Sequence, residues 1–551
     1  MRAADLLVTT LVNAGVNTIY TLSGNQIMPI FDACFEHGIR LVHTRHEAAA
    51  VFMAEAHAQL TGTIGVALVT AAPGFTNALG PLFMAGKSET PVLLLSGDSA
   101  LTQDGMGAFQ ELDQVAASRA LTKHSERVMS AEAIGETTAA AIRCALQGRA
   151  GPVHLALPAD VLTTAVTTTQ APSAASMQAD TPVADRASLT SLLEAIDRAA
   201  RPLCITGPAL NATRQPQLHA RLRKQLGVPV VAMESPRGLN DPSLGGIGEV
   251  LGQADLVIAL GKDLDFTTGF GKPMLAPPAA TVMMIDAQAE ALQRAGAALG
   301  EHLSLQVCAD PLASANALLE IASAGSSERQ TRVAAWAQHV DTAIASRSFS
   351  APADPATTST QPMVPAELCA AVQACLDQSA DPILVIDGGE FGQWAQACLS
   401  APTRIINGVS GAIGGGLCYA LAASIARPEA DVFLLMGDGT SGFHFAEFET
   451  ACRERAGFTA IIGHDGRWNA EHQIQMRDYG AERLIGCELS LARYDQAAQG
   501  LGCHGEYASD PAALQAALAR ALATDLPSCV VVPINGLPAP AAPTPTQHGA
   551  H

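Results

Sequence analysis

The chain has 551 residues, of which 48% are hydrophobic and 15% are charged, and its formal net charge is -20. A chain of this length exceeds what one hydrophobic core can organise, and it has room for about three domains of ordinary size. The negative charge argues against nucleic acid or an anionic membrane surface as a partner, because both would repel an acidic protein.

The cysteines and the N-terminus bear on the compartment. The 12 cysteines include no C-x-x-C pair, and they stand in apolar or helical surroundings that are typical of buried free thiols. Asp5 and Asn13 interrupt any apolar core of a signal peptide. No apolar run approaches the roughly 20 residues that a membrane-spanning helix needs. The sequence therefore favours a cytoplasmic protein.

The first third of the chain alternates strands with helices, which predicts a parallel sheet. A helix is expected from Ala3 to Ala14, and a later, alanine-rich helix begins at Glu47. By its position alone, Glu47 is a negative charge at a helix N-terminus, which stabilises the helix by about a few tenths of a kcal/mol. Two loops follow, 72–77 with Pro73 and Asn77, and 105–113 with Gln110. The strands expected here are 18–21, 39–44, 64–70, 91–96 and one within 151–161.

The middle of the chain predicts a second open parallel sheet. A helix is expected over 189–199, between stretches rich in Ala, Ser, Thr and Pro that indicate linkers. Because no G-x-G-x-x-G motif is present, a structural domain and a domain that binds a nucleotide both stay open. The strands expected here are 202–206, 229–232, 255–260 and 281–286.

Two acid-bearing turns follow buried strands in the last third. Strand 432–436 ends at Gly437-Asp438-Gly439-Thr440, and strand 459–462 ends at His464-Asp465, with a helix over 445–451 between them. Successive parallel strands release their loops at the same sheet edge, so Asp438 and Asp465 can face one another. Two carboxylates with backbone carbonyls and a hydroxyl suit Mg²⁺, and the glycines let a phosphate approach the backbone.

This pair of loops resembles the thiamine-diphosphate fingerprint of the acetolactate synthase, pyruvate decarboxylase and benzaldehyde lyase superfamily. In that fingerprint the G-D-G turn is followed by an Asn-Asn pair, where this chain has His464-Asp465. The substitution keeps an oxygen ligand and adds a negative charge. The resemblance implies thiamine diphosphate and Mg²⁺ as cofactors, with the metal held by Asp438, Asp465 and the backbone carbonyl of Arg467.

Further motifs extend the resemblance to most of the chain. Residues 45–50 resemble the segment whose glutamate, here Glu47, contacts N1′ of the aminopyrimidine ring and promotes loss of the C2 proton. Loop 105–113 resembles the A-F-Q-E-x-D segment of acetolactate synthase, which places Gln110 at the substrate pocket. Glu471 matches an active-site glutamate of pyruvate decarboxylases that handles protons on the intermediate. The cofactor-binding residues implied are Glu47, Pro73, Asn77, Gly389, Glu390, Gly411, Ile413, Asp438, Gly439 and Thr440.

The resemblance implies an acetolactate synthase-like enzyme that forms or cleaves carbon–carbon bonds of 2-oxo acids. The alternatives are a 2-hydroxyacyl-CoA lyase or a benzaldehyde lyase-like carboligase, and a non-catalytic homologue that only binds the cofactor. The expected partners are a small 2-oxo acid, aldehyde or acyl-CoA substrate. A homodimer or homotetramer is expected because family members hold the cofactor between two subunits. FAD in the middle domain, as in some acetolactate synthases, stays open.

The fold class expected is α/β with three open parallel-sheet domains. The glycine-rich segments of the third domain, 388–389 and 407–416, lie before the G-D-G strand in the order that the resemblance implies. The expected organisation is a pyrimidine-binding domain at 1–164, a linker at 165–186, a middle domain at 187–325, a linker at 326–362, a diphosphate-binding domain at 363–538 and a tail at 539–551.

Overall fold

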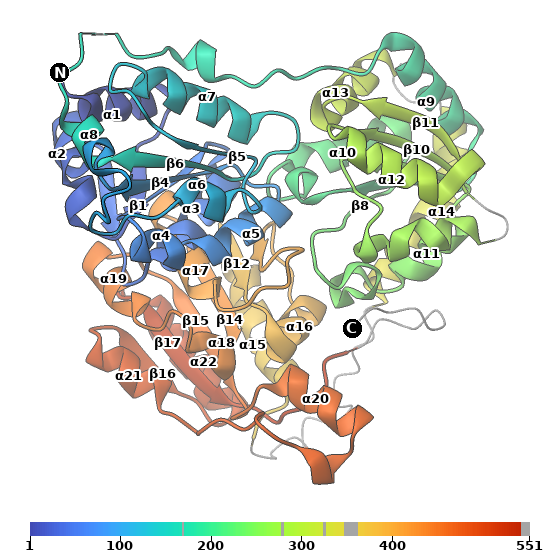
Figure 1. Ribbon diagram of the computed structural model, residues 1–551. Helices are drawn as coiled ribbons and strands as arrows, with labels where there is room; N and C mark the ends of the chain where they lie inside the picture. Colours follow the sequence, from blue (N-terminus) through green and yellow to red (C-terminus); the bar gives the residue numbers. More distant parts are fainter. Residues whose placement is uncertain (168–169, 277–279, 323–326, 347–361, 541–551) are drawn as a thin grey trace.

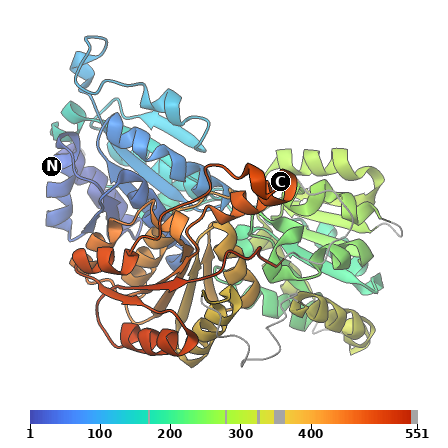
Figure 2. The same cartoon turned by 90° about the horizontal axis from the view of Figure 1, so that it is seen from below.

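Three parallel sheets with helices against them make up the computed structural model (Figure 1). It describes residues 1–540 except 168–169, 277–279, 323–326 and 347–361. The first and third sheets lie against each other through their helices, and the middle sheet stands to one side of both (Figure 2). The expected α/β class with three open parallel sheets is confirmed. Within the described residues, no helix is both long and apolar enough to span a bilayer.

The first sheet has six strands in the order β2-β1-β3-β4-β6-β5, all parallel. Separate apolar clusters on its two faces show that the sheet is buried from both sides. Its strands are β1 (Thr18–Thr21), β2 (Arg40–His43), β3 (Gly65–Val69), β4 (Val92–Asp98), β5 (His124–Arg127) and β6 (Val153–Pro158). Its helices are α1 (Ala3–Asn13), α2 (Met28–His37), α3 (Glu47–Thr61), α4 (Pro73–Asn77), α5 (Leu79–Lys87), α6 (Gln114–Ser118), α7 (Ile134–Leu146) and α8 (Ala159–Thr163).

The middle sheet has five strands in the order β11-β10-β9-β7-β8. The order reverses between β7 and β9, which makes that position the switch point of an open α/β sheet. Its strands are β7 (Pro202–Thr206), β8 (Val230–Ala232), β9 (Leu256–Leu260), β10 (Thr281–Asp286) and β11 (Leu303–Cys308). Its helices are α9 (Arg186–Arg198), α10 (Pro216–Leu226), α11 (Ile247–Gln253), α12 (Ala289–Leu299), α13 (Pro311–Ile321) and α14 (Ser327–Ala345).

Helix α14 corrects the expected linker at 326–362. Its side chains Val333, Trp336 and Val340 recur at helical spacing and are buried, and the last two join the core of the middle sheet. The indole Nε1 of Trp336 donates to the carbonyl of Pro202 at 2.9 Å. The first half of that stretch is thus a helix of the middle domain, and 347–361 lie outside the described residues.

The third sheet repeats the strand order of the first, β13-β12-β14-β15-β17-β16, again with parallel pairing throughout. Its strands are β12 (Pro382–Ile386), β13 (Thr403–Ile406), β14 (Asp431–Gly437), β15 (Thr459–His464), β16 (His504–Tyr507) and β17 (Ser528–Pro533). Its helices are α15 (Pro365–Gln378), α16 (Gly389–Cys398), α17 (Gly416–Ala426), α18 (Asp438–Ser441), α19 (Glu447–Glu454), α20 (Asn469–Asp478), α21 (Tyr494–Gly500) and α22 (Pro511–Leu522).

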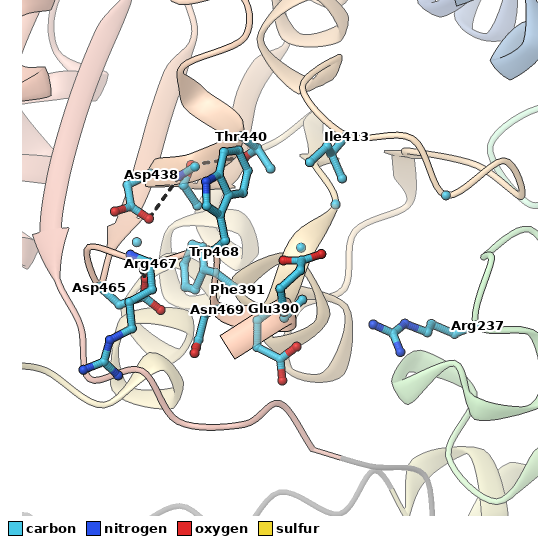
Figure 3. A pocket seen from close by; sticks show the side chains of 18 residues that line it. Arg237, Glu390, Phe391, Ile413, Asp438, Thr440, Asp465, Arg467, Trp468 and Asn469 are labelled. Carbon is cyan, nitrogen blue, oxygen red and sulfur yellow. Dashed lines mark hydrogen bonds between the residues drawn. The ribbon is translucent and has the colours of Figure 1, made fainter. Parts of the chain in front are cut away.

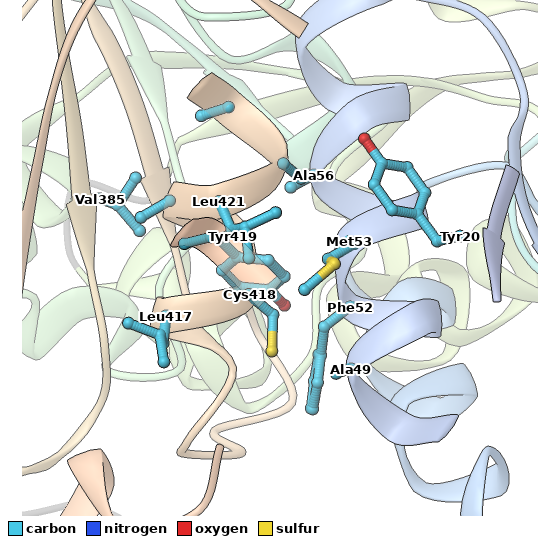
Figure 4. Close-up of a cluster of buried hydrophobic side chains, with 14 of the residues drawn as sticks. Tyr20, Ala49, Phe52, Met53, Ala56, Val385, Leu417, Cys418, Tyr419 and Leu421 are labelled. Carbon is cyan, nitrogen blue, oxygen red and sulfur yellow. The ribbon is translucent and has the colours of Figure 1, made fainter. Parts of the chain in front are cut away.

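Helices α3 and α17 join the first sheet to the third (Figure 4). One buried cluster contains side chains of both sheets and both helices. The rings of Phe52 on α3 and Tyr419 on α17 meet edge to face, 5.8 Å apart. The Tyr419 hydroxyl donates to the fully buried Glu55 carboxylate at 2.9 Å, and Gln59 Nε2 donates to its other oxygen at 3.2 Å. This contact fixes the two sheets relative to one another.

Candidate active site

Strand register places the two acid-bearing turns side by side. In the parallel pair β14–β15, Gly437 is the partner of Gly463, so the residues that follow leave the sheet at the same edge. Asp438 and Asp465 both line the pocket at this edge, and Thr440 lies beside them (Figure 3). This is the juxtaposition that parallel pairing predicts from the sequence.

The carboxylate of Asp438 is buried within the turn. Only 2% of the residue is exposed, and its two oxygens accept hydrogen bonds from the backbone N–H groups of Gly439 (3.0 Å) and Gly466 (2.9 Å). Burial raises the pKa of Asp438 to about 6. Burial and the neighbouring Asp438 raise the pKa of Asp465 to about 7. Two acids that disfavour each other's charge in a buried site form a suitable environment for a cation.

Glycine is required where the walls of the pocket approach the backbone. A Cβ atom at Gly439 would lie 2.8 Å from the ring of Trp468, and one at Gly388 would lie 2.6 Å from Cγ2 of Ile413. Gly389 adopts a φ of +87°, which favours glycine. These positions form a narrow cradle of backbone N–H groups and small residues, which fits a diphosphate.

Asp387, which is not among the expected site residues, holds two of the glycine-rich segments together. It is fully buried after β12 and accepts from the backbone N–H groups of Gly388 (2.6 Å), Gly414 (2.9 Å) and Gly416 (3.0 Å). Burial raises the pKa of this carboxyl group. A buried acid directly before a Gly-Gly pair is the sequence signal that could have identified it.

The other charged residues of the pocket wall are Glu390, Glu471, Arg237 and Arg467. Glu390 accepts from the backbone N–H of Ala539 at 2.6 Å and from Gln393 Nε2 at 3.2 Å, and burial raises its pKa. Arg237 comes from the middle domain and extends towards the pocket (Figure 3). No local pattern in the sequence identifies Arg237, because a different domain brings it to the site.

Glu47 belongs to a separate group of residues in the first domain. It is the first residue of α3 and is 8% exposed, and its carboxylate accepts from Asn77 Nδ2 at 3.0 Å. A Cβ atom at Gly74 would lie 2.8 Å from Cγ2 of Thr70 and 3.4 Å from Glu47 Oε1, so glycine lets this turn pack closely beside the acid. Pro73 and Asn77 are exposed beside it. The carboxyl group of Glu47 and the amide of Asn77 can therefore both face a nitrogen-containing ring.

Gln110 lies on the loop between β4 and α6. Its side-chain oxygen accepts from Gln26 Nε2 at 2.7 Å, and Gln26 Oε1 in turn accepts from the hydroxyl of Thr70 at 2.5 Å. Gln110 has a φ of +61°, an unfavourable conformation for a residue with a side chain. Hydrogen bonds therefore hold this glutamine in a defined orientation on an otherwise exposed loop.

The expected site residues thus form two half-sites within one chain. The third-domain half-site is a single pocket, and Glu47, Pro73, Asn77 and Gln110 are not among the described residues that line it. Its lining includes these expected residues: Gly389, Glu390, Gly411, Ile413, Asp438, Gly439, Thr440, Asp465, Arg467 and Glu471.

The switch point of the middle sheet is occupied by side chains of the first domain. Glu89 accepts from the backbone N–H of Ala209 at 3.1 Å and forms an ion pair with Arg149. Arg149 also binds Asp286 at the end of β10, at 2.5 Å. A carboxylate and a guanidinium therefore stand where an open α/β sheet commonly binds a ligand.

The fold is an α/β protein with two sheets of the same strand order, one presenting a buried acid and the other a glycine-rich acidic turn. Comparison with known proteins gives the family. Residues 1–117 match "Thiamine pyrophosphate enzyme, N-terminal TPP binding domain", and residues 387–532 match "Thiamine pyrophosphate enzyme, C-terminal TPP binding domain". A D-aminopeptidase family also matches residues 81–198, a span that runs from α5 into α9 and follows no domain of this fold.

Individual relatives agree with this assignment over nearly the whole chain. The chain is 30% identical to "Probable acetolactate synthase" of Mycobacterium bovis over 97% of its length and 95% of the relative. It is 31% identical to "2-hydroxyacyl-CoA lyase 2" of Bos taurus, over 89% of the chain and 82% of the relative. The human 2-hydroxyacyl-CoA lyase 2 is 30% identical over the same shares. The protein belongs to the thiamine pyrophosphate enzyme superfamily.

Substitution of Gly439 by alanine is expected to weaken thiamine diphosphate binding. The new methyl group would enter the ring of Trp468, and overpacking of this kind costs about 1–3 kcal/mol of folding stability. Relief of that strain moves Trp468, which lines the pocket, so the affinity is expected to fall by up to about 5- to 150-fold, the equivalent of the same free energy. Gly442→Ala is the matched control, because its Cβ would make an ordinary contact at 3.5 Å on a helical backbone. Titration calorimetry with cofactor and Mg²⁺ measures both variants, and equal affinities would contradict the close approach.

Asp438 and Asp465 are the Mg²⁺ ligands that the sequence predicts, and a metal ion must displace protons from its ligands. On that prediction, cofactor binding is expected to strengthen as the pH rises from about 5.5 to 7.5. The folded-state pKa values, about 6 for Asp438 and about 7 for Asp465, exceed the ordinary value of 3.8. Between pH 3.8 and these higher pKa values, the two carboxyl groups bind fewer protons in the unfolded chain than in the folded one. The free energy of unfolding of the cofactor-free protein therefore falls as the pH rises through this range.

The Asp465→Asn variant supplies the control for this pH dependence. It removes one titrating group and one negative charge, so its affinity should vary less with pH than that of the wild type. Calorimetry in two buffers of different ionisation enthalpy counts the protons released on binding. An unchanged proton count in Asp465→Asn would show that Asp465 does not contribute to the pH dependence.

Proposed function

We propose that the protein is a thiamine diphosphate- and Mg²⁺-dependent enzyme that forms or cleaves carbon–carbon bonds of 2-oxo acids, as an acetolactate synthase does. The observation that carries this proposal is the pair of half-sites: the acidic, glycine-lined pocket of the third sheet and the buried Glu47 of the first. Similarity to the mycobacterial acetolactate synthase over 97% of the chain supports it.

The side chains support distinct roles in that reaction. Asp438, Asp465 and the backbone carbonyl of Arg467 would hold Mg²⁺, and the turn at Gly439 would hold the diphosphate. When bound, thiamine diphosphate supplies a carbon nucleophile that adds to carbonyl groups. Glu47 would hold a proton at a ring nitrogen of the cofactor.

The remaining expected residues would act on the substrate or shape the cofactor. Ile413 and the carbonyl of Gly411 stand on the third-domain wall, where they would support the bent cofactor. Gln110 would orient the substrate through its fixed amide. Glu471, exposed on the wall of the pocket, would move protons to and from the reacting carbon.

The divided site supports a homodimer or homotetramer. Glu47 and Asp438 serve one cofactor but belong to separate half-sites, so a second copy of the chain would complete each pocket. Large apolar side chains near both half-sites favour such a contact. Phe109 is 73% exposed beside Gln110, and Phe443 is 52% exposed beside the pocket wall.

A 2-hydroxyacyl-CoA lyase is the second candidate, because the bovine relative with that name is 31% identical to the chain and the acetolactate synthase is 30% identical, over 89% and 97% of the chain respectively. That reaction uses the same cofactor chemistry on a larger substrate. A homologue that only binds the cofactor is disfavoured, because Glu47 and Ile413 are both present. The substrate therefore distinguishes the two enzymes, and turnover distinguishes both from the third possibility.

The decisive assay incubates the holoprotein with pyruvate, other 2-oxo acids or 2-hydroxyacyl-CoA and identifies the products by mass spectrometry. Acetolactate from pyruvate would support the first candidate. Cleavage of the C1–C2 bond of a 2-hydroxyacyl-CoA, which yields an aldehyde one carbon shorter and formyl-CoA, would support the second. Glu47→Gln should lower turnover about 100- to 10,000-fold, the usual contribution of a positioned acid or base. Glu36→Gln, on the exposed face of α2, should leave turnover unchanged. Wild-type protein that binds no cofactor would refute the proposal.

We also propose that the middle domain is structural and that FAD is not a cofactor. A dinucleotide at the switch point would have to displace the Glu89–Arg149 ion pair and compete with Glu89 for the N–H of Ala209. Purified protein should therefore lack flavin absorbance near 450 nm and show no change in its melting temperature with added FAD. A stoichiometric flavin spectrum would overturn this part of the proposal.

A further inference from the structure

The segment between α18 and α19 connects the two half-sites within one chain. Phe443 lies against the pocket wall, with its ring 6.2 Å from that of Trp468 and within contact of Gly414. The next residue, His444, places its ring 5.7 Å from His46 and 5.4 Å from Phe52, both in the first domain. The segment thus touches the cofactor pocket at one point and the beginning of α3 at another.

Glu447, at the start of α19, makes a direct polar contact with the first domain. The residue is 1% exposed, and its Oε1 accepts from the backbone N–H groups of Arg45 (2.9 Å) and His46 (3.1 Å). Its Oε2 accepts from the hydroxyl of Thr450 at 2.7 Å, which orients the carboxylate. Both carboxylate oxygens therefore have partners in the described structure.

The two N–H groups that Glu447 binds belong to the residues immediately before Glu47. His46 is the N-cap of α3, and its Nδ1 accepts from the backbone N–H of Ala48 at 3.1 Å. The backbone of Arg45 and His46 determines the direction in which the side chain of Glu47 extends from the first turn of α3. A buried carboxylate from the third domain therefore fixes the part of the first domain that aims the expected catalytic acid.

We propose that Glu447 is a positioning residue for Glu47. By holding the backbone of Arg45 and His46, it couples the third-domain edge to the orientation of the acid in the first domain. This inference rests on the proposed function, in which Glu47 acts on thiamine diphosphate. Glu447 itself touches neither the cofactor pocket nor the substrate, so it acts only through Glu47.

Three substitutions separate this role from general stabilisation. Glu447→Ala removes the carboxylate that accepts from the backbone N–H groups of Arg45 and His46. Glu447→Gln keeps a side-chain oxygen that can accept from both. Glu449→Ala is the matched control. It removes a carboxylate of the same helix that lies 3.9 Å from the guanidinium of Arg45, a contact with the side chain instead of the backbone.

The measurement is the rate at which the C2 proton of bound thiamine diphosphate exchanges with deuterium, followed by quenching and NMR at saturating cofactor. We expect Glu447→Ala to slow exchange about 10- to 100-fold, the scale of a catalytic group misplaced by a fraction of an ångström. Cofactor affinity, measured by calorimetry, should change less than about threefold because the diphosphate pocket is intact. Glu447→Gln and Glu449→Ala should exchange close to the wild-type rate.

The inference is overturned if Glu447→Ala exchanges at the wild-type rate, if Glu449→Ala slows exchange equally, or if Glu447→Gln is as slow as the alanine variant. Should Glu447→Ala fail to fold, Glu447→Asp withdraws the carboxylate by one methylene and must show the same slowing. Failure of the proposed function looks different, because wild-type protein would then bind no cofactor or exchange no C2 proton.

Discussion

The packing of α3 against α17 is the contact on which the arrangement of the site depends. Alanines on both helices let them approach closely, and a Cβ atom at Gly415 would lie only 3.0 Å from the ring of Phe52. Within this contact Glu55 is fully buried, and burial raises its pKa to about 7. The Tyr419 hydroxyl satisfies it from the opposite helix. A polar pair inside an apolar contact fixes the register of the helices, because any shift would take away the donor that the opposite helix supplies to this buried carboxyl group.

Each of these two helices begins at one half-site. Helix α3 begins at Glu47, and α17 begins after the glycine-rich segment that carries Ile413. Both helices precede the third strand of sheets that share one strand order, so the two half-sites occupy equivalent positions in their sheets. The chemistry of the two positions has nevertheless diverged. One presents the carboxylate of Glu47, and the other presents glycine-rich backbone beside Asp438 and Asp465.

The sequence is sufficient to predict elements and site residues whose signal lies within a short stretch of the chain. Buried apolar runs followed by acid-bearing glycine turns predicted β14 and β15, and parallel pairing then placed Asp438 beside Asp465. Strands at sheet edges were harder to predict. In β11, half-buried and exposed positions alternate, and β13 is short and contains Arg404, so neither shows the continuous apolar run of a central strand.

Residues whose role depends on distant parts of the chain could not be predicted from the sequence. Arg237 reaches the pocket from another domain, and the partners of Glu447 lie about 400 positions earlier. Glu89 lies at the middle-domain switch point only because the first and second domains meet there. Composition indicates a boundary only at 346–361, and the expected linker at 326–362 reaches further back over Val333, Trp336 and Val340. These three residues carry the helical pattern that places α14 on the middle sheet.

The close fit between α3 and α17 limits how such proteins can be recombined. A chimera that takes its first domain from one homologue and its third from another would bring together two helix surfaces that were shaped separately. A larger side chain at Ala49 or Ala420 would push the helices apart and shift both half-sites at once. Productive domain exchange therefore requires both helices to come from the same parent, whatever the source of the surrounding loops.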